Sequence, residues 1–192
     1  MFSLLQEINA TKLVINQVQS GGDKVSDEKM LVTLNKMELI SKDDWSLIWT
    51  CVSPFVLKVR GKNDLINMQV YRELSKHQQR LFIFTVYYNH ARQSVDDFIY
   101  YGKLLIENNY WPELIEAMDF FKDGKMLDLL VRIETEMKKS TISVTADLSR
   151  AEIVPNSIKD LFKDFLPISD DTLKLIGNEI RQNAPDYFNL IN

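Results

Sequence analysis

The sequence contains a single cysteine, Cys51, among its 192 residues. An internal disulfide and any cysteine-based zinc site are therefore excluded. The residues around Cys51 are apolar and include Trp49 and Val52. We therefore interpret Cys51 as a buried small hydrophobic residue and not as a reactive thiol.

Glycine is also scarce, with six in the whole chain. The one adjacent pair, Gly21-Gly22, is not followed by the Gly-Lys-Ser/Thr arrangement of a phosphate-binding loop, so nucleotide hydrolysis is not expected. No Gly-x-Ser-x-Gly or His-Glu-x-x-His motif occurs in the sequence. The sequence therefore assigns no catalytic residue.

No long hydrophobic run is present. The longest, Leu81 to Tyr88, is interrupted by Thr85 and is far shorter than the roughly 20 residues that a membrane-spanning helix needs. The amino terminus has no basic residues ahead of its apolar ones and no small-residue cleavage site, so we predict no signal peptide and a cytoplasmic location.

Histidine occurs only twice, at His77 and His90. On one helix an offset of thirteen residues places two side chains about 220° apart, which does not suit a shared metal ion. We interpret His77 as solvent-exposed and His90 as the end of a helix, where a protonated imidazole is favourable. Neither a metal site nor a cofactor is predicted.

The patterning that is present is helical from end to end. With 45% apolar and 26% charged residues the chain is of the globular class. The spacing of apolar residues predicts an all-α fold, one domain over 1–192, built as a bundle of about eight to nine helices around a central apolar helix, residues 75–92. A hinge is expected at 20–25 and an extended linker at 140–156, and whether 141–145 forms a strand is left open.

Capping residues place several of these helices. We expect Ser26 to cap a helix with Leu34 and Met37 on one face, and Ser41 to open a capping box for a helix that ends at Pro54. The run from Leu81 to Tyr88 could also be a buried strand, and the capping box from Ser75 to Gln78 favours a helix. Further starts are predicted at Ser94, Pro112, Leu127, Asn156 and Ser169.

The most informative pattern is a reversal of charge in the middle of the chain. Residues 56–92 contain seven basic and two acidic residues, whereas residues 96–136 contain ten acidic and four basic ones. The net charge of −4 conceals this segregation. Segregated charge indicates how a protein associates with partners and does not determine its fold.

Four acidic residues recur at helical spacing in the acidic segment: Glu113, Glu116, Asp119 and Asp123. Offsets of three and four place them along one predicted helical face, neighbours about 5 Å apart. A solvated helix face is one interpretation. The other is a surface that presents regularly spaced negative charge to a basic partner, as a phosphate backbone would.

The basic segment carries its own stripe, formed by Arg72, Lys76 and Arg80 at intervals of four. The sequence pI of about 5.3 argues against direct nucleic-acid binding. The stripe would pair with acids of its own chain or of a second copy, which leaves a homodimer and a monomer as open alternatives.

Two segments resemble a bacterial all-α family, the DNA-mimic proteins and their uncharacterised relatives. One is Val70 to Phe82 followed by Asp97 to Tyr101, and the other is the closing stretch 173–188 with its polar-x-x-acidic-Phe ending. The family's Asn-Gly-Gly-Phe-like turn is replaced here by Asp96-Asp97 before Phe98. The resemblance implies a helical fold and, for the characterised members, an acidic surface that binds a DNA-binding protein in place of DNA.

The leading hypothesis is a non-enzymatic interaction module whose acidic face binds a basic surface of a partner protein. The partner could be a nucleic-acid-binding protein. The alternative is a small-ligand-binding protein or enzyme with a pocket near Tyr87, Tyr88, His90 and Tyr101. Convergence of these four side chains on an open pocket would favour the alternative, and their burial in a packed core would count against it.

Overall fold

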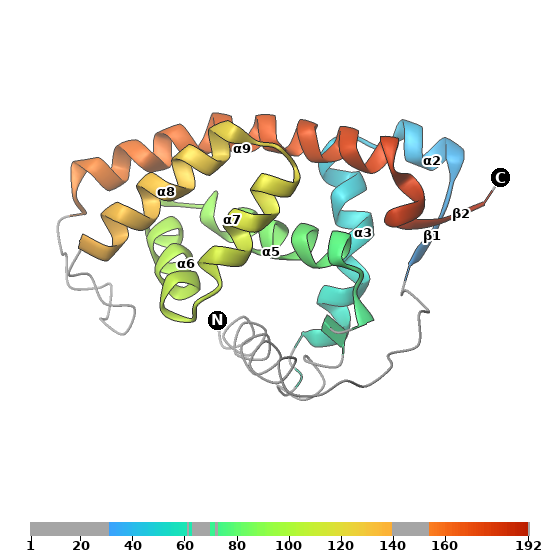
Figure 1. The fold of residues 1–192 in the computed structure, drawn as a ribbon, viewed down its shortest axis with the longest axis horizontal. Helices are drawn as coiled ribbons and strands as arrows, with labels where there is room; N and C mark the ends of the chain where they lie inside the picture. The colour runs from blue at the N-terminus through green and yellow to red at the C-terminus, as the bar shows by residue number, and fades with distance from the viewer. Residues whose placement is uncertain (1–30, 61, 63–69, 72, 140–153, 192) are drawn as a thin grey trace. The chain divides into compact units, whose positions relative to one another are not determined.

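The computed structural model of the chain describes residues 31–60, 62, 70–71, 73–139 and 154–191 (Figure 1). Within these residues lie seven α-helices and one two-stranded sheet, so the protein is mostly helical. This confirms the helical character of the predicted fold, whereas the number of helices differs from the one expected. The predicted hinge at 20–25 and the segment 141–145 lie outside the described residues.

The chain divides into two compact units. The first comprises residues 1–82 and 176–192, and the second comprises residues 83–175. Two helices, α5 (Lys76–Ala91) and α9 (Asn156–Gln182), contribute residues to both units. A single domain built around a central helix stays a prediction.

A small parallel sheet in the first unit was not foreseen. Strands β1 (Val32–Asn35) and β2 (Phe188–Ile191) pair with each other. The predicted helix with Leu34 and Met37 on one face is therefore wrong, because Leu34 lies in β1 and Met37 lies exposed in helix α2 (Lys36–Ser41). The strand's partner is at the far end of the chain, so the local spacing of apolar residues could not reveal it.

The junction between β1 and α2 is fixed by a reciprocal cap. Asn35 Oδ1 accepts a hydrogen bond of 2.8 Å from the Glu38 main-chain N–H, and the Asn35 N–H donates to Glu38 Oε2 at 3.3 Å. A cap of this kind satisfies two main-chain donors that the first turn of a helix leaves free. The strand therefore ends, and the helix begins, at a single residue.

Helix α3 (Asp44–Val59) differs from its prediction at both ends. Asp43 caps it in place of Ser41, accepting a hydrogen bond from the Ser46 N–H, and the helix continues through Pro54. An interior proline costs about 3 kcal/mol, whereas each fully buried aliphatic or aromatic side chain contributes about 1.5–3 kcal/mol. The helix is therefore maintained by its buried face: Leu47, Ile48, Cys51, Val52, Phe55 and Val59.

An ionic clasp joins the start of α3 to the end of α9 in the first unit. Arg181 donates to Asp44 Oδ1 at 2.6 Å and to the Lys42 carbonyl at 2.9 Å. Gly177, one turn earlier on α9, faces the same carboxylate, and a Cβ at this position would overlap it. The absence of a side chain at Gly177 therefore lets the Asp44 carboxylate lie against α9.

The structure confirms the helix that the capping box from Ser75 to Gln78 predicted, which is α5. The Gln78 N–H donates to Ser75 Oγ at 3.2 Å, and the Ser75 N–H donates to Gln78 Oε1 at 2.9 Å. The apolar run from Leu81 to Tyr88 is helical, with all eight residues buried. The strand alternative for this segment is therefore excluded.

The second unit contains helices α6 (Val95–Glu107), α7 (Trp111–Phe120), α8 (Gly124–Lys139) and the first part of α9. Ser94 caps α6 as predicted, accepting a hydrogen bond from the Asp97 N–H. Figure 1 shows α8 running alongside α9. Aromatic rings in edge or tilted contact form part of the core of this unit: Tyr87, Phe98, Trp111 and Phe165.

Helix α9 is one helix where two were predicted. It passes through Pro167 without a break, and Ser169, the expected cap of a second helix, is buried within it. The Ser169 hydroxyl donates instead to the Leu166 carbonyl at 2.8 Å. Buried residues on both sides of Pro167, such as Phe165 and Ile176, outweigh the local preference for a break. None of the helices in the described residues is both long and apolar enough to span a membrane.

Candidate acidic interface on helix α7

The structure places three of the four predicted acidic residues on one helix and the fourth in the turn that follows it. Glu113, Glu116 and Asp119 lie on α7, at successive intervals of three residues. Asp123 lies beyond the end of α7. The predicted row of four carboxylates on one helix is therefore wrong, and three remain together.

Asp123 has a structural role in the second unit. It is only 5% exposed, and its two carboxylate oxygens accept hydrogen bonds from the Met126 N–H at 3.0 Å and from the Thr172 hydroxyl at 2.6 Å. The first bond caps α8, and the second ties the start of α8 to α9. The signal was available in the sequence, because Asp is one of the residues preferred at the cap before a helix.

Helix α7 packs on the core of the second unit through its apolar face. Trp111, Leu114, Ala117 and Met118 are buried, at the spacing of one apolar helical face. Asn109, with a φ of 61°, turns the chain into the helix, and Lys122, with a φ of 57°, turns it out. These turns and the buried face set the direction of the acidic side chains.

Glu113 occupies an unfavourable electrostatic environment. Its side chain is half-buried, and its Oε2 atom has no solvent access and no hydrogen-bond partner among the described residues. Burial raises the pKa of Glu113, a hydrogen bond from its own main-chain N–H opposes that shift, and the charge of Glu116 adds to it. A cation placed beside this carboxylate would offset both the cost of burying its charge and the repulsion from Glu116.

The other two acids of α7, Glu116 and Asp119, are exposed to solvent. Neither Glu113 nor Asp119 forms an ion pair with any residue that the structure describes. On α8 and α9, by contrast, six acidic residues lie between 2.7 and 3.8 Å from a Lys or Arg nitrogen of the same unit: Asp128, Glu134, Glu136, Asp160, Asp164 and Asp171. The charges of Glu113 and Asp119 are therefore not compensated in the way that these six charges on α8 and α9 are.

The basic stripe is described only in part, because Arg72 lies outside the described residues. Lys76 is exposed and donates to Gln79 Oε1 at 3.0 Å, and Arg80 is half-buried. Pairing of this stripe with a second copy of the chain stays a prediction.

The residues of the alternative pocket lie in aromatic packing. Tyr87 is 1% exposed, and its ring contacts Trp111 and Phe165 at centroid distances of 5.5 Å. Burial raises the pKa of its phenol. Its hydroxyl has no hydrogen-bond partner among the residues described. Tyr87 therefore belongs to a packed core.

The other three residues of that pocket also have close neighbours. Tyr88 is buried and accepts a hydrogen bond of 2.5 Å from Arg92. His90 stacks on Tyr101 with a centroid distance of 4.3 Å, and burial lowers the pKa of His90 while the charge of Asp97 opposes this shift. This packing counts against a ligand pocket formed by the four residues.

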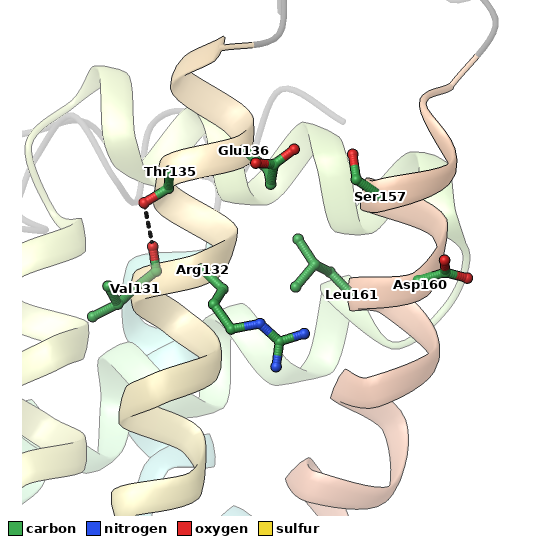
Figure 2. A pocket seen from close by; sticks show the side chains of 7 residues that line it. All are labelled: Val131, Arg132, Thr135, Glu136, Ser157, Asp160 and Leu161. Atoms are coloured by element: carbon green, nitrogen blue, oxygen red, sulfur yellow. Dashed lines mark hydrogen bonds between the residues drawn. The ribbon is translucent and has the colours of Figure 1, made fainter.

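A cleft of about 380 Å³ does occur in the second unit, between α8 and α9 (Figure 2). None of the four predicted pocket residues lines it. Its charged side chains are paired: Arg132 with Asp164 at 2.8 Å, Glu136 with Lys139 at 2.9 Å and Asp160 with Lys163 at 2.8 Å. Its lining comprises Val131, Arg132, Thr135, Glu136, Ser157, Asp160 and Leu161.

Among the described residues no group of three or more His, Cys, Asp or Glu side chains could hold a metal ion. The comparisons with known proteins give no match, neither to a protein-family model nor to a curated protein nor to a solved structure.

Proposed function

We propose that the protein is a non-enzymatic interaction module, and that Glu113, Glu116 and Asp119 of α7 bind a basic surface on a partner protein. The observation that carries this proposal is the contrast between helices. Glu113 and Asp119 have no ion pair among the described residues, whereas six acids of α8 and α9 are neutralised by basic residues of their own unit. Lys or Arg side chains of a partner would supply the missing positive charge.

The binding would proceed in two stages. Segregated negative charge attracts a basic partner at long range and raises the association rate. At short range Lys or Arg side chains pair with the carboxylates, and the pair with Glu113 gains most because that group is partly removed from water. Exposed charges are screened within about 8–10 Å at ordinary ionic strength, so the affinity falls as salt rises.

The partner class that fits best is a nucleic-acid-binding protein. Three carboxylates at regular helical intervals form a linear array of negative charge. A protein that binds a phosphate backbone presents clustered Lys and Arg side chains of complementary sign. The resemblance to DNA-mimic proteins points to the same class of partner.

A pull-down from a cell lysate at low and at high salt tests the proposal. The baits are the native chain, the variant E113Q/E116Q/D119N, and the variant D160N/D164N/D171N, which removes the same number of negative charges from α9. We expect basic proteins to be recovered by the native chain and the α9 variant and lost with the α7 variant. Addition of double-stranded DNA should release partners that bind through their DNA-binding surface.

Two results would contradict the proposal. Recovery of the same partners by the α7 variant would remove α7 from the interface. Equal losses with the two variants would show a response to net charge alone, without a defined binding face. A third result, retention of partners in the presence of DNA, would contradict only the proposal that the partner is a nucleic-acid-binding protein.

A further inference from the structure

We draw no further inference here: the strongest candidate, the cleft between α8 and α9 lined by Arg132, Glu136 and Asp160, carries none because each of these charged side chains is already ion-paired within its own unit and nothing in the structure shows what would occupy the cleft.

Discussion

The Thr172 hydroxyl donates a hydrogen bond of 2.6 Å to the buried carboxylate of Asp123, across 49 residues of sequence. The same carboxylate caps α8 through the Met126 N–H. The Asp123 side chain therefore caps the start of α8 and also joins α8 to α9 in the second unit. Removal of Asp123 leaves the Met126 N–H without this acceptor, and removal of Thr172 leaves one carboxylate oxygen without its donor.

We expect Asp123→Ala to destabilise the protein by about 2–3 kcal/mol, since it removes a helix cap and a hydrogen bond to a charged group. Thr172→Val should cost about 1–2 kcal/mol, because the carboxylate keeps its second partner. Urea unfolding of the two single variants and the double variant measures both costs and their coupling. Asp119→Ala, an exposed acid, serves as the control and should change stability by less than about 0.5 kcal/mol. Additive effects of the two substitutions would contradict the account.

A second prediction concerns Gly177, where an added Cβ would overlap the Asp44 carboxylate. Alanine ordinarily favours a helix over glycine by about 1 kcal/mol. We expect Gly177→Ala nevertheless to destabilise the protein, because Arg181 holds the carboxylate in place. Gly124→Ala is the matched control, since a Cβ at that position has nothing within 4 Å. Equal effects of the two substitutions in thermal unfolding would show that Asp44 moves aside freely.

The environment of Glu113 predicts a pH dependence with a definite sign. Its pKa is raised in the folded protein, so the folded state binds this proton more tightly than the unfolded state does. The contribution of the group to stability is present below its unfolded pKa of about 4.3 and is lost as the pH rises through the folded value. Glu113→Gln should therefore stabilise the protein at neutral pH, and this gain should disappear near pH 4. Unfolding measured from pH 4 to pH 7 checks the trend, and a gain that grows toward low pH would contradict it.

The buried thiol of Cys51 gives a chemical test of the fold. It is fully buried, and burial raises its pKa to about 12. Since the thiolate is the reactive form, a disulfide reagent at pH 8 should not modify the native protein. One equivalent of thiol should react when urea unfolds the chain. Rapid modification without denaturant would show that α3 does not pack as described.

The sequence predicted the local features of the fold and missed those that depend on distant residues. The caps at Ser75 and Ser94 were found because a cap is formed by residues within one turn. The pairing of β1 with β2 was missed because the two strands lie at opposite ends of the described chain. Pro54 was predicted to end one helix and Ser169 to start another, and burial of the surrounding faces overrides both local rules.

The same distinction applies to the acidic site. Helical spacing correctly grouped Glu113, Glu116 and Asp119 on one helix. It could not show that Asp123 turns inward to a hydrogen-bond partner 49 residues away. Nor could spacing show that Glu113 is half-buried, because burial comes from tertiary packing.

We propose that α7 binds a basic partner through a defined face and not through the net charge of the chain. Fluorescence anisotropy with a labelled decameric arginine peptide, repeated over a range of salt concentrations, tests it most directly. Three ion pairs at no less than about 0.5 kcal/mol each predict that E113Q/E116Q/D119N weakens binding at least about tenfold at low salt. The α9 variant D160N/D164N/D171N should bind nearly as tightly as the native chain, and the difference between the two variants should shrink as salt rises. Equal weakening by both variants, or no weakening by the α7 variant, would contradict the account.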